Sequence, residues 1–213
     1  MKVARVFSTR ATLFHVKPYW IRATEYVGIT PSARQIEQMG LYRDWLVSEA
    51  VVAGGIGPAE TGRIDRRHLA DSVLFATQII GEPGPVWDLG SGVGLPGFPL
   101  AIALPGMEFV LVDRSGRRVD LMKRVVRILE LDNCGIVRGD VSDLEPMMAT
   151  VVARASLPPE RLGEEVRRLL RPGGLAVAAG SWEEAPHHRG WVPIEIPRDV
   201  LDRTVWILIM RRE

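Results

Sequence analysis

The sequence has a single cysteine, Cys134, which excludes an internal disulfide framework and a cysteine-based metal cluster. Its four histidines do not show the spacing of a zinc site, so we expect no metal ion. No apolar run approaches the roughly 18 residues that a membrane-spanning helix needs, and residues 1–26 contain no signal-peptide core. We therefore expect a cytoplasmic protein that does not enter a membrane.

Net charge is also small, because 27 lysines and arginines oppose 26 acidic residues and leave a charge of +1. A protein without an overall positive field binds nucleic acid only through a local cluster of cations. The 213 residues are 46% hydrophobic, which is enough for one domain with a full core and no disulfide staples. Charge alone therefore favours no substrate class.

What the sequence does contain is a glycine-rich stretch, Val86–Gly97, which reads VWDLGSGVGLPG. An apolar run ends at Asp88 and glycines follow at alternate positions, so we expect a buried strand, a sharp turn and the start of a helix. Glycine permits positive φ and lets a ligand approach the backbone, and the N–H groups at a helix start favour an acidic group. The candidate binding positions are Asp88, Gly90, Gly92, Gly94 and Pro96.

The spacing of these glycines discriminates between kinds of nucleotide-binding loop. Leu95 stands where the dinucleotide fingerprint G-x-G-x-x-G requires glycine, and no P-loop motif occurs in the sequence. The remaining interpretation is the glycine loop usual in S-adenosylmethionine (SAM) methyltransferases. A glycine-rich turn that binds no ligand is the alternative.

From residue 86 onward, strand and helix patterns alternate. This alternation predicts a Rossmann-like α/β fold, in which helices cover both faces of a seven-stranded, mostly parallel sheet. Strands are expected at 86–89, 108–112, 134–138, 150–153, 174–179, 191–196 and 203–210, and helices near 96–104, 115–130, 141–147 and 159–170. No clear helix separates the last two strands, so we expect the final strand to be antiparallel.

The chain is predicted to divide into an N-terminal leader at 1–30, a helical extension at 31–83 packed on the core, and the methyltransferase domain at 84–213. Thr30-Pro31 predicts the start of a helix over 31–52, and apolar periodicity predicts a second helix over 63–80. The charged start of the second helix indicates, from composition alone, only a solvated surface.

Two acidic positions follow predicted strands. Asp113 ends the second strand, where a right-handed crossover places its carboxylate beside the glycine loop, able to accept hydrogen bonds from ribose hydroxyls. Asp140 and Val141 follow the third strand, where they can contact an adenine ring. Asp140 can equally cap the predicted helix at 141–147, and an exposed loop acid is the alternative for Asp113.

Arg154 follows the fourth strand, at the sheet edge where methyl acceptors meet the cofactor in such folds. The sequence has no Asn-Pro-Pro-Tyr or Asp-Pro-Pro-Tyr motif, which disfavours methylation of an exocyclic amine. Cys134 lies elsewhere, which disfavours attack on a pyrimidine carbon. A ring nitrogen such as guanine N7 already offers a lone pair and needs only positioning. Arg154 would orient that acceptor, or else form an ion pair at a buried edge.

Further motifs accompany the glycine loop. They are GIGP at 55–58, RHLADS at 67–72, Val112-Asp113 with Arg117-Arg118, Ala153-Arg154-Ala155, LRPGG at 170–174 and DRTV at 202–205. Over about residues 30–213 these motifs resemble the bacterial 16S rRNA guanine-N7 methyltransferase family, and GIGP is similar to its actinobacterial branch. The glycine loop with its Pro-Gly tail is the most specific of them.

The resemblance implies transfer of a methyl group from SAM to N7 of a guanine in 16S rRNA, by a monomer that binds the rRNA or the small ribosomal subunit. It assigns Arg154, His68 and Asp71 to the catalytic pocket. It assigns the glycine loop, Asp113, Asp140, Val141 and Arg154 to the cofactor. The arginines expected to face RNA are Arg63, Arg66, Arg67, Arg117 and Arg203.

At Ala179 the sequence departs from the family pattern, because the family usually has lysine there. Fewer cations weaken contacts to phosphate, which keeps two alternatives open. The first is the same fold acting on a small molecule or a protein. The second is a SAM-binding or nucleoside-binding module without catalysis.

Overall fold

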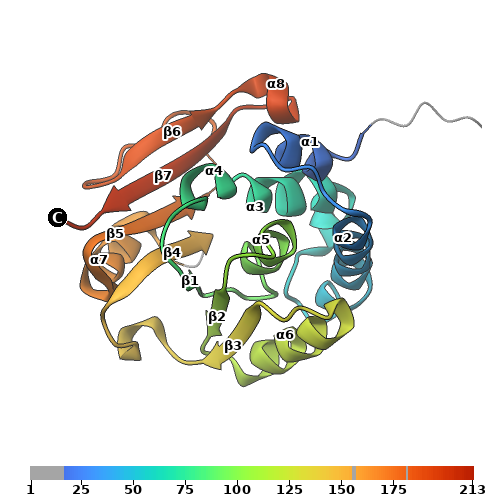
Figure 1. Cartoon of the computed structure of the whole chain (residues 1–213), viewed down its shortest axis with the longest axis horizontal. Coiled ribbons are helices and arrows are strands. Elements are labelled where there is room, and N and C mark those ends of the chain that lie inside the picture. The colour runs from blue at the N-terminus through green and yellow to red at the C-terminus, as the bar shows by residue number, and fades with distance from the viewer. Residues whose placement is uncertain (1–16, 155–156, 181) are drawn as a thin grey trace, which may run out of the picture.

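The computed structural model describes residues 17–154, 157–180 and 182–213. A seven-stranded sheet in the order β3-β2-β1-β4-β5-β7-β6 forms its centre (Figure 1). The strands are β1 (Val86–Leu89), β2 (Phe109–Asp113), β3 (Cys134–Arg138), β4 (Met148–Arg154), β5 (Leu170–Ala179), β6 (Val192–Ile196) and β7 (Val205–Arg211). Strands β1 to β5 are parallel, whereas β7 pairs antiparallel with β5 and with β6. The predicted Rossmann-like sheet and its antiparallel last strand are confirmed.

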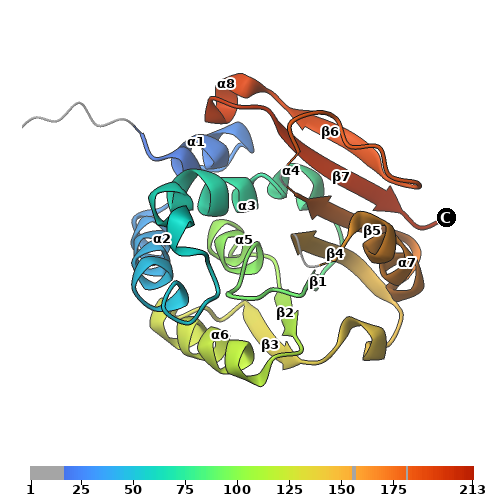
Figure 2. The same cartoon turned by 180° about the vertical axis from the view of Figure 1, so that it is seen from behind.

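Helices cover both faces of this sheet (Figure 2). They are α1 (Tyr19–Tyr26), α2 (Ala33–Trp45), α3 (Asp71–Val73), α4 (Ala76–Ile79), α5 (Gly97–Ala103), α6 (Gly116–Leu129), α7 (Pro159–Leu169) and α8 (Arg198–Leu201). Buried side chains of α2, α5 and α6 share one core with strand residues such as Phe109 and Val177. Helix α7 packs into a second core with the next strand positions, Ala176 and Ala178. Successive residues of β5 thus alternate between the two cores, with the two-residue period of a strand.

The helix predicted over 31–52 begins two residues later than the Thr30-Pro31 pair suggested. Ser32 caps α2, because its hydroxyl accepts the Gln35 N–H while the Gln35 side chain accepts the Ser32 N–H at 2.8 Å. This reciprocal capping box outweighs the preference of proline for the first helical position. After Trp45 the chain continues as a π-helical turn, Leu46–Ala50.

Two other segments predicted as continuous α-helices have a different secondary structure. The segment 63–80 is not one helix but a π-helical turn (Ile64–Ala70) followed by α3 and α4. The segment 141–147 contains only a 3-10 turn, Val141–Asp143, after which Leu144 is extended. Pro146 disfavours helical conformation at Glu145, so a helix could not have continued to 147.

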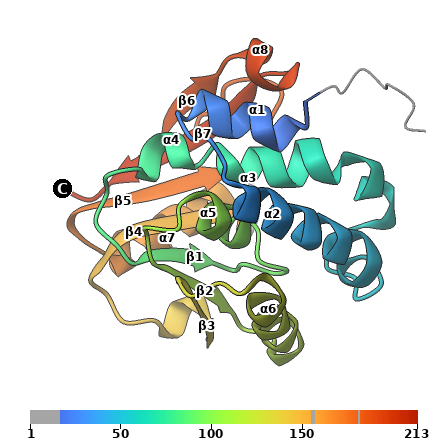
Figure 3. The ribbon, with the colours of Figure 1, turned by 45° about the vertical axis from the view of Figure 1, so that its right-hand side comes forward.

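Helix α1 lies inside the segment predicted as a leader, and it packs between the π-turn 64–70 and α8 (Figure 3). The Tyr19 N–H donates to Asp65 Oδ2 at 2.7 Å, and the Arg22 guanidinium donates to both carboxylate oxygens of Asp202 at 3.0 Å. Residues 1–16 of the predicted leader lie outside the described residues. The division at 30 and 83 remains a prediction, and side chains from 31–83 and from 84–213 share one core.

Within the described ranges, no helix is both long enough and apolar enough to span a membrane.

Candidate active site

A cavity of about 520 Å³ opens where the strands end, in the size range of small-molecule sites. The glycine loop and the ends of β2, β3 and β4 form its floor, and the N-terminal segment 55–68 and the start of α7 form its walls. The lining residues used below are Gly55, Glu60, His68, Gly90, Gly92, Asp113, Arg114, Arg118, Asp140, Val141, Arg154, Arg161 and Glu165. Most of the predicted cofactor positions therefore meet in one place.

The glycines of the loop do two different things. Gly90 and Gly92 have φ of 71° and 62° and line the cavity, so here the missing side chains leave room for a ligand. Gly94 also has positive φ, but a Cβ there would lie 2.0 Å from the ring of Phe98. Gly94 is thus required by packing, and neither it nor Pro96 lines the cavity, in contrast to the prediction.

Asp88 is also absent from the cavity lining, because it is fully buried beneath the loop. Its Oδ2 accepts the Gly97 N–H at 2.9 Å, so the protein's own carboxylate occupies the start of α5 that was predicted to attract a ligand. Oδ1 finds no hydrogen-bond partner among the described residues. Burial raises the pKa of Asp88 to about 7. Asp88 therefore shapes the loop from below.

Asp113 connects the end of β2 to the loop. Its Oδ2 accepts the Gly92 N–H at 3.0 Å and its Oδ1 accepts the Ser115 N–H at 2.8 Å. Arg118 Nη1 lies 3.5 Å from Oδ2. The carboxylate is held from three sides at the cavity wall, which is where the spacing to the glycine loop predicted it.

Asp140 caps the turn that follows β3 and also lies at the cavity. Its Oδ1 accepts from the Ser142 N–H at 3.1 Å and the Ser142 hydroxyl at 3.0 Å, which caps the 3-10 turn. These hydrogen bonds lower the pKa of Asp140. The residue and its neighbour Val141 also line the cavity.

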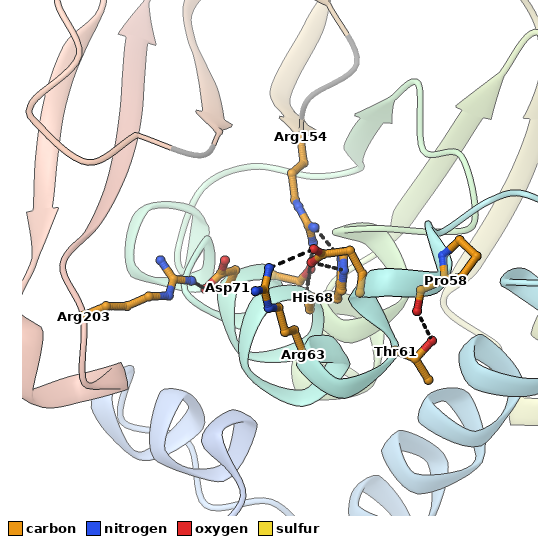
Figure 4. A network of polar contacts seen from close by, with 9 residues as sticks. Pro58, Thr61, Arg63, His68, Asp71, Arg154 and Arg203 are labelled. Atoms are coloured by element: carbon orange, nitrogen blue, oxygen red, sulfur yellow. Dashed lines mark hydrogen bonds and ion pairs between the residues drawn. The ribbon is translucent and has the colours of Figure 1, made fainter.

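Arg154 and His68 lie side by side and form a polar part of the cavity wall (Figure 4). The Arg154 Nη2 group donates to His68 Nδ1 at 2.6 Å, and Nη1 lies 3.3 Å from both the His68 carbonyl oxygen and the Ser72 hydroxyl. Burial, together with the Arg154 charge, lowers the pKa of His68 to about 4. The imidazole is therefore neutral near pH 7. Of the predicted Ala153-Arg154-Ala155 element, Ala155 lies outside the described residues.

Asp71 does not line the cavity, although the resemblance placed it there. Its carboxylate forms an ion pair with Arg203, and Figure 4 shows the two side chains turned toward each other. Burial raises the pKa of Asp71, and the nearby Arg203 and Arg154 charges oppose that shift. Asp71 thus pairs with Arg203, and its charge also raises the pKa of Arg154 against the lowering by burial.

The arginines predicted to face RNA differ in their surroundings, and none of the five lines the cavity. Arg66 donates to the Leu201 carbonyl at 2.9 Å and lies over the Tyr19 ring, so it holds α1 and α8. Arg203 is committed to Asp71, and Arg63 pairs with Glu60 at 3.2 Å. Arg67 is half-buried and Arg117 is exposed. Their roles toward RNA remain predictions.

Sequence reasoning missed several lining residues. Gly55 belongs to the noted GIGP motif but was given no role, and a Cβ there would lie 2.1 Å from Val93 Cγ1 of the glycine loop. Glu60 carried no signal beyond its place between GIGP and RHLADS. Arg114, Arg118 and Arg161 form a cationic rim at the cavity. Arg118 belongs to the Arg117-Arg118 pair, of which the resemblance predicts only Arg117 to face RNA.

The parallel sheet with its antiparallel last strand, and the glycine loop that follows β1, define the class I methyltransferase fold. A crystal structure of a MtNAS variant in complex with S-adenosylmethionine shares this fold, with a TM-score of 0.56 over 83% of this chain and 72% of that chain, at 17% identity. The family model described as rRNA small subunit methyltransferase G, or GidB, matches residues 35–187. The chain belongs to the GidB family.

Similar curated proteins carry the name "Ribosomal RNA small subunit methyltransferase G". That of Frankia casuarinae is 37% identical over 172 residues, which cover 74% of this chain and 64% of that protein. That of Acidothermus cellulolyticus is 36% identical over 146 residues (67% and 65%), and that of Salinispora arenicola is 38% identical over 159 residues (69% and 65%). The chain thus spans just under two thirds of the length of these relatives.

Proposed function

We propose that this chain is a SAM-dependent methyltransferase that transfers a methyl group to N7 of a guanine in 16S rRNA. The name of its relatives supports the rRNA substrate, and the cavity built around Gly90, Gly92 and Asp113 supports the cofactor. We place the reaction in the cytoplasm, with the monomer acting on the rRNA or the small subunit.

The residues present fit the cofactor. Gly90 and Gly92 leave space beside the backbone, and the Asp113 carboxylate, fixed by two backbone N–H groups, has lone pairs left for two ribose hydroxyls. Asp140 and Val141 would face the adenine. When bound, SAM supplies an electrophilic methyl group on a sulfonium.

The acceptor chemistry needs positioning more than proton transfer. Guanine N7 carries its lone pair in the neutral base, so no residue has to remove a proton before attack. His68 is already committed as an acceptor to Arg154, which agrees with a site that lacks a general base. Arg154, held by His68 and Ser72, would orient the base.

The RNA would approach across the cationic rim. Arg114 after β2, Arg118 in the first turn of α6 and Arg161 on α7 lie at the cavity, and Arg117 is exposed beside Arg118. Phosphate contacts of this kind position the nucleic acid, and base contacts inside the cavity would give specificity. This rim replaces Arg66 and Arg203 as the surface that we assign to RNA.

The test is transfer of labelled methyl from SAM to small ribosomal subunits that lack the N7 modification, with mapping of the labelled base. We expect label on one guanine of 16S rRNA. No label in RNA, despite measurable SAM binding, would overturn the rRNA assignment and favour a small-molecule or protein substrate. Asp113→Ala should abolish SAM binding, and Asp120→Ala, at an exposed position of α6, should not.

A further inference from the structure

Four of the described residues that line the cavity are carboxylates: Glu60, Asp113, Asp140 and Glu165. Asp113 and Asp140 lie at strand ends on the cofactor side. Glu165 lies near Val141, because its partner Arg168 also donates to the Val141 carbonyl at 2.7 Å. Glu60 lies apart from these, on the wall that carries His68, and no role has been given to it.

The Glu60 side chain is anchored but accessible. It sits on the 3-10 turn Pro58–Arg63, which the Thr61 hydroxyl tightens by donating to the Pro58 carbonyl at 2.8 Å (Figure 4). Arg63 Nη1 lies 3.2 Å from Oε1. The side chain is 31% exposed, so its carboxylate can still reach a ligand in the cavity.

The second carboxylate oxygen of Glu60, Oε2, points toward His68. Glu60 Oε2 lies 3.5 Å from His68 Nε2, and the other ring nitrogen of His68 accepts from Arg154. A carboxylate, a neutral imidazole and a guanidinium thus follow one another along this wall. Of the three, only the carboxylate is purely an acceptor of hydrogen bonds.

A guanine that receives a methyl group at N7 turns its Hoogsteen edge to the methyl donor. Its opposite edge then presents two donors, N1–H and the 2-amino group, to the protein. Enzymes that act on an extruded base read this Watson–Crick edge by hydrogen bonds. Adenine has a lone pair at N1, which a carboxylate would repel.

We propose that Glu60 recognises the acceptor guanine by accepting hydrogen bonds from its N1–H and 2-amino groups. The inference rests on the proposed function and names the specificity residue within it. Arg63 holds the carboxylate in place and acts as a positioning residue. Glu60 is therefore assigned to selection of the base and not to the cofactor.

The test compares two acceptors: small subunits reconstituted with 16S rRNA that carries either guanine or hypoxanthine at the mapped position. Hypoxanthine lacks only the 2-amino group. We expect kcat/KM of the unaltered protein to fall about 10-fold with hypoxanthine, and Glu60→Gln to lower kcat/KM on guanine by about 10- to 100-fold. For Glu60→Gln the penalty for hypoxanthine should shrink to roughly 3-fold or less.

Controls separate recognition from structure. Glu164→Gln, at an exposed position of α7, should behave like the unaltered protein on both acceptors. Glu60→Gln should bind SAM with unchanged affinity. An equal loss on both acceptors would show that Glu60 only supports the wall, and a loss of SAM affinity would place it on the cofactor side. Either result overturns the inference while the proposed function stands. Failure of the unaltered protein to methylate guanine overturns both.

Discussion

The side chains of Arg154 and His68 meet through a hydrogen bond of 2.6 Å, from guanidinium Nη2 to imidazole Nδ1. Arginine has no acceptor, so Nδ1 must be the acceptor and the ring proton lies on Nε2, which faces Glu60. The imidazole therefore fixes a buried cation at the cavity wall. It does not serve as a general base, because Nδ1 already accepts a hydrogen bond from Arg154.

Replacements of His68 should separate the role of hydrogen-bond acceptor for Arg154 from that of a general base. In His68→Asn an amide oxygen can stand near the position of Nδ1, whereas His68→Leu leaves a buried donor of Arg154 without a partner. We expect His68→Leu to lose about 1–3 kcal/mol of unfolding free energy and to lower kcat about 10-fold more than His68→Asn. Chemical denaturation and methyl-transfer rates measure both. Equal loss in the two variants would contradict the acceptor role.

The titration of His68 gives an independent check that its imidazole is buried and neutral beside Arg154. Its folded-state pKa is about 4, below the ordinary value of 6.5, so the unfolded chain takes up the proton first as pH falls. His68 therefore reduces stability as pH falls from about 6.5 to about 4, and contributes no change above that window. The NMR shifts of the His68 imidazole carbons, followed as a function of pH, should show a titration midpoint near pH 4. A midpoint near 6.5 would mean that the ring is solvated.

Asp88 should produce a pH dependence of opposite sign. Burial raises its folded-state pKa from an ordinary 3.8 to about 7, although the Gly97 hydrogen bond and the Arg154 charge oppose this shift. The folded state binds the extra proton, so the stabilising contribution is present below about pH 4 and is lost as pH rises to about 7.

Asp88→Asn removes this titration. The unfolding free energy of the unaltered protein minus that of Asp88→Asn should therefore fall between pH 4 and pH 7, by on the order of 4 kcal/mol. Taking the difference cancels the contribution of His68, which titrates in both proteins. Denaturant melts at several pH values test the sign, and a difference that stays flat would mean that Asp88 is ionised throughout.

The sequence predicted which residues gather at the strand-end part of the cavity, because chain order determines it. Asp113 and Asp140 follow apolar strands, and in a right-handed parallel sheet consecutive strand ends meet at one edge. The glycine pattern also marked the loop correctly. It did not reveal that Gly94 serves Phe98, since that contact depends on how α5 packs.

The part of the cavity wall formed by the N-terminal segment could not be predicted in the same way. Residues 64–70 form a π-helical turn, in which the usual helical period no longer tells which side chains share a face. Arg66 consequently points to α8 and not to solvent. At the start of α6, Arg118 lines the cavity and Arg117 does not, because one residue along a helix rotates the side chain by about 100°. The sequence pattern of a short segment therefore does not show which of two neighbouring residues faces the cavity.

The two arginines Arg66 and Arg117 should therefore respond differently to replacement by alanine. Arg66→Ala removes a hydrogen bond to Leu201 and the contact with Tyr19, so it should lower unfolding free energy by about 1–2 kcal/mol. Its effect on the salt dependence of rRNA binding should be small. Arg117→Ala should leave stability unchanged and reduce the slope of log affinity against log salt by about 1. The reverse pattern would restore Arg66 to the RNA surface.

Gly55 connects the N-terminal segment to the glycine loop. A Cβ there would lie 2.1 Å from Val93 Cγ1 and 3.3 Å from the Ala50 carbonyl oxygen, so alanine must displace the wall or the loop. Val93 is also fixed through its carbonyl, which accepts the Tyr42 hydroxyl at 2.9 Å, so the loop resists moving. We expect Gly55→Ala to weaken SAM binding by about 10-fold or more, because the new methyl group would displace the backbone of the wall or of the glycine loop in a tightly packed region.

Gly62→Ala provides the matched comparison, because nothing lies within 4 Å of a Cβ at that exposed position. Calorimetric titration with SAM should give an unchanged affinity for Gly62→Ala and a reduced one for Gly55→Ala. A second substitution, Val93→Ala, removes the atom that the new methyl group meets and should restore part of the affinity in Gly55→Ala. If Gly55→Ala binds SAM normally without that second change, the wall formed by residues 55–57 moves freely and does not shape the cofactor site.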